Sequence, residues 1–214
     1  MGKLIDGKAI AEKILAGVAR EVRNLPAKGG KPHLGIILVG NNPASEVYVR
    51  RKQVAAEQVG IEFSLFRFPP SIIQDELIQK IRHIQKKKRI SGLIVQLPIP
   101  EHLYTPDVLN AIDPAYDVDC LADISVGRLA MSTQLVEPPT AGAVMEILRF
   151  HDIQLAGKSI TIVGMGALVG KPLALLCINA RASITTANSL TKPLSTKTKT
   201  ADIVISGVGK QNLI

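Results

Sequence analysis

The sequence predicts an α/β protein of two lobes, each built on a parallel-type sheet. Two observations carry this prediction. Short aliphatic runs alternate with helix-like segments in both halves of the 214 residues, and such alternation is typical of parallel sheets covered by helices. In the second half, the glycine-rich turn GMGALVG (164–170) follows a predicted strand and precedes a predicted helix, so we expect the second lobe to be Rossmann-like.

The N-terminal half reads as three helices and three strands. A helix is predicted over 6–25, because apolar residues recur every four positions from Ile10 to Val22 and Asp6 can act as its cap. LGIILVG then predicts a strand buried on both faces. The remaining expected elements are a helix over 42–59 with Asn42 as cap, the strand IEFSLFRF, a helix over 72–88, and the strand SGLIVQLPIP, which prolines stop.

The C-terminal half begins after a turn-rich stretch, IDPAYDVDCLADISVGRL. A helix is expected over 140–151, followed by a strand in GKSITIVG, the glycine turn, a helix, and the strands ASITTAN and ADIVISGVG. With the crossing between lobes near 129–139, we expect a substrate domain at 1–135 and a nucleotide-binding domain at 136–214.

Composition excludes several classes of protein. Aromatic residues make up 3% of the chain and Trp is absent, which leaves few stacking platforms for single-stranded nucleic acid. The formal charge is +8, but its densest run, KKKR at 86–89, follows a helix-like segment, as helix-end cations usually do. Anionic small molecules are therefore the expected partners, with no nucleic acid.

Cysteine and histidine spacing predicts neither a disulfide framework nor a metal site. The two cysteines and four histidines are dispersed, without C-x-x-C or H-E-x-x-H spacing. The N-terminus lacks the apolar stretch of a signal peptide, and no apolar run is long enough to span a bilayer. We expect a cytoplasmic protein that does not enter the membrane.

A polar group stands near the start of the helix over 42–59. Ser45, Tyr48 and Lys52 have the spacing i, i+3 and i+7, which predicts that they project together from one face. A solvated helix would give the same pattern. The Tyr-x-x-x-Lys spacing also suggests short-chain dehydrogenases, but in that family the glycine-rich turn comes first, whereas here it follows.

The glycine turn has the spacing G-x-G-x-x-x-G, one residue longer than the common dinucleotide fingerprint. Glycines there allow the backbone to approach a pyrophosphate at the N-terminus of the following helix. Asn188 and Ser189 stand at the end of the next strand, where an acidic residue would bind the ribose 2′-hydroxyl. Nucleotide binding is expected without that acidic group.

Several motifs together resemble one family, the bifunctional methylenetetrahydrofolate dehydrogenase/cyclohydrolases of one-carbon metabolism. LVGNNPASEVYVRRKQVAAEQVGI is similar to the substrate-helix motif of that family, GLIVQLPIP to its Val-Gln-Leu-Pro motif, IDPAYDVDC to its Asp-Val-Asp-Gly turn, and VGMGALVGKP to its cofactor loop. The resemblance implies oxidation of methylenetetrahydrofolate with NADP, NAD being possible, and hydrolysis of the methenyl product to formyltetrahydrofolate.

The resemblance also implies roles for individual residues. Lys52 would be the acid/base group that acts on the attacking water, Gln96 would hold Lys52, and Tyr48 would pack against the folate. Asp119 would accept the paired N–H groups of the pterin ring. Further substrate contacts would be Ser45, Leu97 and Pro98, and cofactor contacts would be Gly164, Met165, Gly166, Val169, Gly170 and Ser189. Tetrahydrofolate derivatives are the implied partners, and a homodimer the implied assembly.

The chain departs from the family pattern at several positions. Cys120 replaces the glycine of the Asp-Val-Asp-Gly turn, and its Cβ would strain the backbone if φ is positive there. Met165 and Gly166 replace an Arg-Ser pair, which removes a candidate partner for the 2′-phosphate of NADP; Arg181 and Lys192 are the cations expected to compensate. A non-catalytic folate- or nucleotide-binding relative, or a gene fragment, is therefore the alternative to the enzyme.

The family pattern also continues beyond Ile214. We accordingly expect the nucleotide lobe to be incomplete at its C-terminal end and hydride transfer by the 214-residue chain to be poor. A third hypothesis, a nucleic-acid-binding module, is suggested by charge alone.

Overall fold

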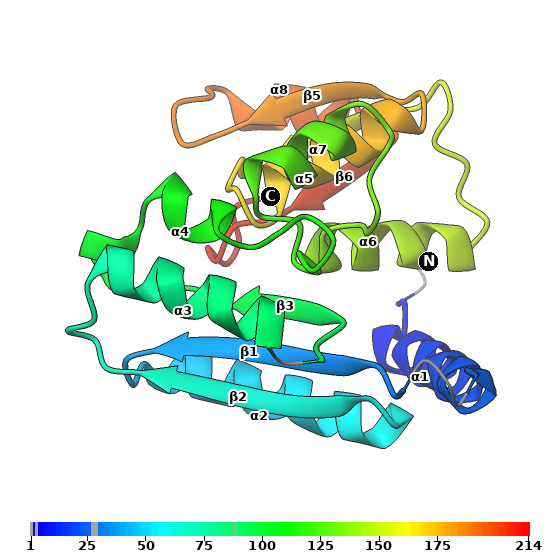
Figure 1. Ribbon diagram of the computed structural model, residues 1–214. Helices are drawn as coiled ribbons and strands as arrows, with labels where there is room; N and C mark the ends of the chain where they lie inside the picture. Colours follow the sequence, from blue (N-terminus) through cyan, green and yellow to red (C-terminus); the bar gives the residue numbers. More distant parts are fainter. Residues whose placement is uncertain (1, 3, 27–29, 88) are drawn as a thin grey trace. The chain divides into compact units, whose positions relative to one another are not determined.

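Helices and strands alternate along the chain in the computed structural model, which describes residues 2, 4–26, 30–87 and 89–214 (Figure 1). Two compact units result, Met1–Ile124 and Ser125–Ile214. Lys88, part of the basic run singled out in the sequence, lies outside the described residues. The predicted α/β class with parallel sheets is confirmed.

The first unit contains a three-stranded parallel sheet with the order β2-β1-β3. Its elements are α1 (Gly7–Asn24), β1 (His33–Val39), α2 (Pro43–Val59), β2 (Glu62–Phe68), α3 (Gln74–Lys87), β3 (Gly92–Val95), the 3-10 helix η2 (Glu101–Leu103) and α4 (Pro106–Asn110); α5 (Asp123–Ala130) follows across the division.

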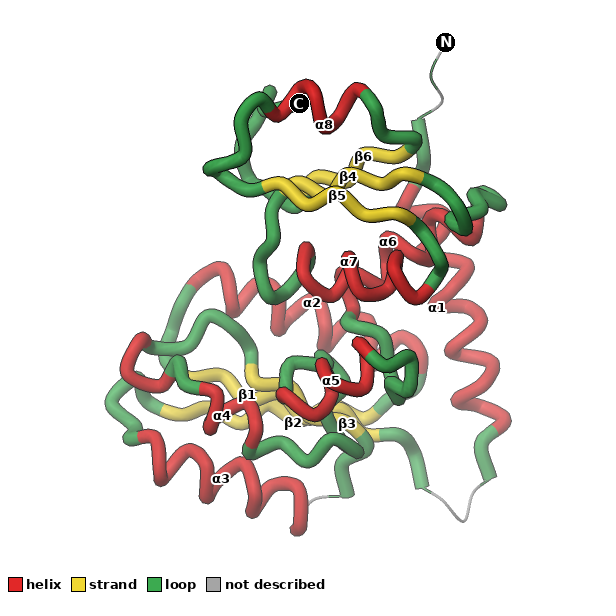
Figure 2. The backbone as a smooth tube through the Cα atoms, turned by 90° about the horizontal axis from the view of Figure 1, so that it is seen from above, coloured by secondary structure: helices red, strands yellow, loops and turns green. Residues whose placement is uncertain are grey.

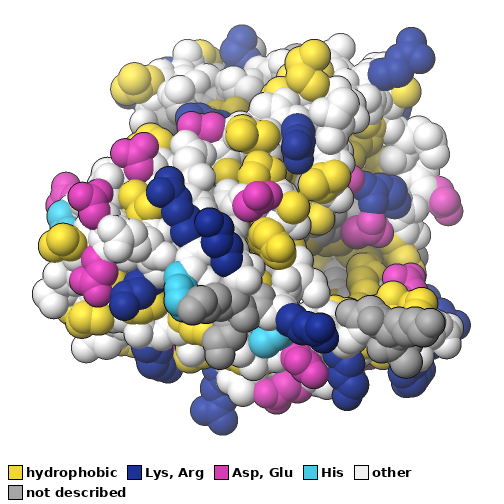
Figure 3. All heavy atoms as spheres, viewed as in Figure 1, with side chains coloured by type: hydrophobic (Ala, Val, Ile, Leu, Met, Phe, Trp, Pro, Cys, Tyr) yellow, Lys and Arg dark blue, Asp and Glu magenta, His cyan; other side chains and the backbone are white. Residues whose placement is uncertain are grey.

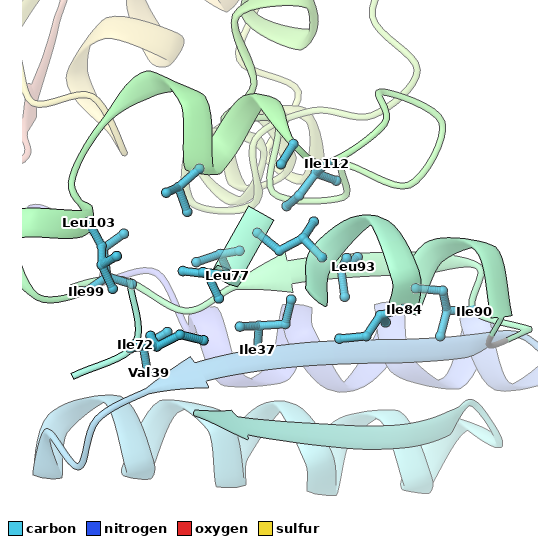
Figure 4. Packing of buried hydrophobic residues seen from close by; sticks show 14 residues of the cluster. Ile37, Val39, Ile72, Leu77, Ile84, Ile90, Leu93, Ile99, Leu103 and Ile112 are labelled. Atoms are coloured by element: carbon cyan, nitrogen blue, oxygen red, sulfur yellow. The ribbon is translucent and has the colours of Figure 1, made fainter. Parts of the chain in front are cut away.

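Strand β1 is buried on both faces, as its unbroken aliphatic run predicts. Ile37 and Val39 lie in one hydrophobic cluster with Leu77 of α3, while Ile36 and Leu38 lie in another that includes a valine of α2. Figure 4 shows the first cluster, with α3 side chains directed at the sheet. The alternation along β1 therefore places one helix layer on each face.

Helix α1 begins at the predicted cap, since Asp6 Oδ1 accepts hydrogen bonds from the backbone N–H groups of Lys8 and Ala9. Its apolar stripe is less buried than predicted. Only Ile10 is fully buried, and Ile14 is 43% exposed. The reason is that α1 packs against α2 rather than directly on the sheet, so it forms an outer layer.

The second unit repeats the first arrangement, with a parallel sheet of order β5-β4-β6. Its elements are α6 (Pro139–Phe150), β4 (Ser159–Val163), α7 (Gly170–Asn179), β5 (Ser183–Ala187), α8 (Leu194–Lys199) and β6 (Ile203–Ser206). Figure 2 shows α6 and α7 on one side of this sheet and α8 on the other. The buried Thr161 of β4 donates its hydroxyl to the carbonyl of Lys197, which ties α8 to the sheet.

The surface carries charges of both signs. On the face drawn in Figure 3, Lys and Arg side chains lie among acidic and hydrophobic ones. None of the helices in the described ranges has the length and apolar content required to cross a bilayer.

Candidate functional site

Helix α2 starts where the sequence predicts, directly after the carboxyl end of β1. Asn42 Oδ1 accepts hydrogen bonds from the N–H groups of Ala44 and Ser45, at 3.0 and 3.1 Å. Pro43 occupies the first turn, where its missing N–H costs nothing. The chain reverses between strand and helix at Gly40, whose φ is +81°. The first turns of α2 are therefore held at the carboxyl edge of the sheet.

The prediction that Ser45, Tyr48 and Lys52 project together is only partly correct. Seven residues of helix advance about 700°, which leaves Ser45 and Lys52 only about 20° apart, whereas three residues leave Tyr48 about 60° to the side. Ser45 is 1% exposed and its Oγ has no hydrogen-bond partner, while Tyr48 is 57% exposed. The serine faces inward and the tyrosine lies on the outer flank.

Lys52, Gln96 and Asp119 come together from three separate segments. Lys52 Nζ donates to Gln96 Oε1 at 3.2 Å and lies 3.8 Å from Asp119 Oδ2. The buried Gln96 follows β3, and its backbone N–H donates to the Ile37 carbonyl of β1 at 2.9 Å. Its Nε2 donates to the Leu97 carbonyl at 2.7 Å, which leaves Oε1 to face the lysine. Leu97 itself is half-buried.

Pro98, the remaining predicted substrate contact, is exposed beside this group. It follows Leu97 through a cis peptide bond. The structure therefore places Gln96, Leu97 and Pro98 in one short segment that leaves the sheet at the edge where α2 begins.

The turn that carries Asp119 is shaped by two of its neighbours, Cys120 and Asp117. Cys120 has a positive φ of +56°. The expected backbone strain from its Cβ is therefore present at this position. The buried Asp117, which was not singled out, accepts hydrogen bonds from the backbone N–H groups of Leu121 and Ala122. No short-range pattern marks such a residue, because its partners lie four and five positions further along.

The Asp119 carboxyl is partly desolvated. Burial raises its pKa above the ordinary value, the nearby Lys52 lowers it, and the Asp117 carboxylate raises it again. The neighbouring Cys120 thiol is also affected, since burial, Asp117 and Asp119 raise its pKa to about 11. This thiol is protonated at neutral pH and is not a nucleophile.

Asp119→Asn is expected to stabilise the fold at neutral pH. A carboxyl whose folded-state pKa is raised binds its proton more tightly when folded, so the protein loses stability as pH rises from the unfolded-state value through the folded one. The asparagine variant does not lose stability in this way. Its free energy of unfolding at pH 7 should therefore exceed that of the wild type by about 0.5 kcal/mol or more. Urea unfolding of both proteins from pH 4 to 8 measures it; a difference that shrinks as pH rises would contradict the argument.

The glycine turn in the second unit is a tight cradle. Gly164 has φ of +93°, and a Cβ there would lie 2.6 Å from Val208 Cγ1. A Cβ on Gly170 would overlap the carbonyl oxygen of Gly164, whereas Gly166 faces open space. Helix α7 begins at Gly170 with Val169 as its cap residue, which offers no side-chain acceptor. The N–H groups of Lys171 and Leu173 donate to the carbonyls of Gly166 and Val169, and among the described residues no hydrogen bond takes up the N–H of Gly170.

The end of β5 carries no carboxylate. Asn188 Oδ1 accepts the N–H of Leu190, and Ser189 is exposed beside it. Lys192 follows within the same loop. Arg181, expected to compensate for the missing arginine, lies at the amino end of β5 instead; five strand residues, about 16 Å, separate the two ends. Arg181 cannot serve a ligand at Ser189, and that expectation is wrong.

These residues fit a nicotinamide dinucleotide. The cradle from Gly164 to Gly170 admits close approach of a pyrophosphate because side chains are excluded at both ends. The unsatisfied N–H at the start of α7 attracts its negative charge. The loop that follows β5, residues 188–193, contains no acidic residue that would repel a 2′-phosphate.

Two family models match the chain. Residues 5–119 match the catalytic domain of tetrahydrofolate dehydrogenase/cyclohydrolase, and residues 138–214 match its NAD(P)-binding domain. Among similar proteins, the bifunctional protein FolD of Geotalea daltonii is 41% identical over 214 residues, which are 100% of this chain and 76% of the relative. FolD of Nautilia profundicola is 43% identical over 211 residues, 99% of this chain and 74% of the relative.

Solved structures agree with the family models. The bifunctional enzyme FolD from Campylobacter jejuni superposes with a TM-score of 0.95 at 36% identity, covering 99% of this chain and 76% of that one. The Trypanosoma brucei FolD, solved with NADP and an inhibitor, gives a TM-score of 0.91 at 32% identity, with 98% and 72% covered. The resemblance read from the motifs is thus confirmed: the chain belongs to the tetrahydrofolate dehydrogenase/cyclohydrolase family.

Proposed function

We propose that this chain oxidises methylenetetrahydrofolate to methenyltetrahydrofolate with NADP or NAD, and hydrolyses the product to formyltetrahydrofolate in one-carbon metabolism. Membership of the family supports both reactions. The observation that carries the proposal is the meeting of Lys52 Nζ with Gln96 Oε1 at 3.2 Å and Asp119 Oδ2 at 3.8 Å, within the residues that match the catalytic domain.

Lys52 is the group we assign to proton transfer. Hydrolysis of the methenyl carbon requires that water lose a proton as it attacks and that the departing ring nitrogen gain one, so a single positioned acid/base group serves both steps. Gln96 Oε1 holds one N–H of Lys52. Because the Gln96 amide is itself anchored to Leu97 and to β1, the Nζ atom is held in place.

Asp119 is assigned to recognition of the pterin ring. In the described part of the chain its carboxyl accepts no hydrogen bond, and its contact with Lys52 at 3.8 Å is longer than one. A desolvated carboxylate without donors gains most from a ligand that presents two parallel N–H groups, as the pterin edge does. Tyr48 offers an exposed ring to pack against the folate, and Ser45, Leu97 and Pro98 complete the proposed contacts.

The second unit would hold the nicotinamide dinucleotide. Gly164, Met165, Gly166, Val169, Gly170 and Ser189 are the proposed contacts. When bound, the nicotinamide supplies the hydride acceptor for the methylene carbon. The residues of the chain would supply the glycine cradle, the N–H of Gly170 and, after β5, Ser189.

Discrimination between the two nucleotides should be weak. Met165 offers no charge to a 2′-phosphate, and Arg181 lies at the wrong end of β5, so Lys192 is the remaining candidate. We expect NADP and NAD affinities to differ by less than a hundredfold in isothermal titration. Lys192→Met should bring the NADP and NAD affinities still closer together. The control is Lys158→Met, which should leave both affinities unchanged, since Lys158 pairs with Asp202. A hundredfold preference for NADP, about 2.7 kcal/mol, would mean that another residue binds the phosphate.

The proposal also covers domain roles, assembly and location. Residues 1–135 are assigned to folate chemistry and 136–214 to nucleotide binding. A homodimer is supported by exposed apolar side chains in the second unit, among them Met131 and Ile178. A cytoplasmic site of action is supported by Cys120 and Cys177, which are free and buried.

The test is direct. The purified chain is supplied with methylenetetrahydrofolate and each nucleotide, and the methenyl and formyl products are followed separately. Turnover of methenyltetrahydrofolate without nucleotide supports the cyclohydrolase assignment, and reduced nucleotide formed with methylenetetrahydrofolate supports the dehydrogenase. If the folate compounds bind but neither is converted, the enzymatic proposal is wrong and the non-catalytic relative is correct.

A further inference from the structure

We propose that Asp117 is a positioning residue for the reaction assigned above, with a carboxylate that both shapes the turn carrying Asp119 and acts electrostatically on the Asp119 carboxyl. This inference rests on the proposed function and deepens it. Asp117 has none of the proposed substrate contacts, but it lies two positions before Asp119 in the same turn, and its exposed fraction is only 3%.

The amino side of the turn is fixed to the first sheet. Leu93 of β3 forms a parallel bridge with Asp117, and its N–H donates to the Tyr116 carbonyl at 2.7 Å. Contact there is close, because a Cβ on Gly92 would lie 2.6 Å from Val118 Cγ1. Asp117 therefore starts the turn from a rigid position.

The carboxylate of Asp117 then closes the turn. Its Oδ2 accepts the N–H groups of Leu121 at 3.0 Å and Ala122 at 2.9 Å, and its Oδ1 accepts the Leu121 N–H at 3.3 Å. The enclosed Cys120 has φ of +56°, a conformation that persists only when the surroundings impose it. The carboxylate supplies that constraint, and the same closure directs Asp119 toward Lys52.

The charge of Asp117 also reaches Asp119. Two charged groups act on the Asp119 carboxyl, the Lys52 ammonium from α2 at 3.8 Å and the Asp117 carboxylate, and the next residue in the chain is Cys120 with its protonated thiol. Burial raises the pKa of Asp119, Lys52 lowers it and Asp117 raises it. Removing the Asp117 charge should therefore favour the ionised form of Asp119.

Two substitutions separate the two roles. Asp117→Asn can place its oxygen where Oδ2 lies, keeping the two shorter hydrogen bonds while removing the charge. Asp117→Ala removes both. Asp113→Asn is the matched control, since Asp113 is exposed in the same crossover and accepts a single backbone N–H, from Ala115.

The primary readout is the titration of Asp119 followed by carbon-13 NMR of its carboxyl, with Asp119→Asn identifying the signal. We expect the midpoint to move to lower pH in Asp117→Asn and to stay in place in Asp113→Asn. The acidic limb of the kcat/KM profile for methenyl hydrolysis should move in the same direction. Asp117→Ala should lose about 10²-fold in kcat/KM, the effect of a misplaced site.

An unchanged Asp119 midpoint in folded Asp117→Asn would overturn the electrostatic role, and wild-type kcat/KM in Asp117→Ala would overturn the positioning role. A purely structural residue would lower activity equally at every pH without moving the midpoint. If the wild-type chain converts neither folate compound, the proposed function fails, while the NMR titration still decides the effect of Asp117 on Asp119.

Discussion

Replacing Lys52 with Met is expected to lower the rate of methenyltetrahydrofolate hydrolysis by about 10²- to 10⁴-fold, the usual contribution of a general acid/base group. The methionine side chain has a similar length but no group that gives or takes a proton. Gln96 cannot take over, because its amide nitrogen is committed to the Leu97 carbonyl. Single-turnover hydrolysis at saturating substrate, with folate binding measured separately, distinguishes lost chemistry from lost affinity.

The control is Lys80→Met on α3. Lys80 is exposed and forms a single surface ion pair with Glu76 at 3.9 Å, which contributes little to stability. Hydrolysis by this variant should equal that of the wild type. Near-normal hydrolysis by Lys52→Met in a protein that binds folate would remove Lys52 from its assigned role.

The second large effect is expected at Gly170. A Cβ there would overlap the Gly164 carbonyl oxygen and crowd the backbone of Met165. Since those atoms are backbone, the turn must open to relieve the overlap, at a cost of about 3 kcal/mol in unfolding free energy. Gly170→Ala should therefore lower the urea midpoint and abolish measurable nucleotide binding in isothermal titration.

Gly166→Ala is the comparison within the same turn. A Cβ at Gly166 meets no atom within 4 Å, so its stability should match the wild type within about 0.5 kcal/mol. Equal loss of stability in the two alanine variants would show that the cradle is not held by the close approach of Gly170 to Gly164.

Much of the fold was predictable because local signals agreed with the tertiary structure. The aliphatic run at β1 predicted burial on both faces, and Asp6 and Asn42 cap helices as their side chains allow. Short elements were not predicted. Helix α8, with the sequence LSTKTK, has no apolar periodicity. It is held to the sheet by the buried hydroxyl of Thr161 in β4, which donates to the Lys197 carbonyl.

The site was predictable in its members but not in its geometry. Lys52 and Gln96 are 44 positions apart and meet because the carboxyl ends of β1 and β3 share one edge. Helical spacing placed Ser45 beside Tyr48, but a 60° offset separates a buried position from an exposed one. Arg181 was misplaced since distance along the chain does not say which end of a strand a residue occupies.

The strand order of the two sheets has a consequence for how the chain is made. In each unit the first strand to leave the ribosome becomes the central one, flanked later by the two that follow it: β1 by β2 and β3, and β4 by β5 and β6. Every new strand can then add to a free side of the strand already present, and none has to be inserted between two paired neighbours. Synthesis supplies only about 5–20 residues per second, so each strand has time to pair before the next one is made. The strand pairs formed early are therefore the same pairs that the structure contains.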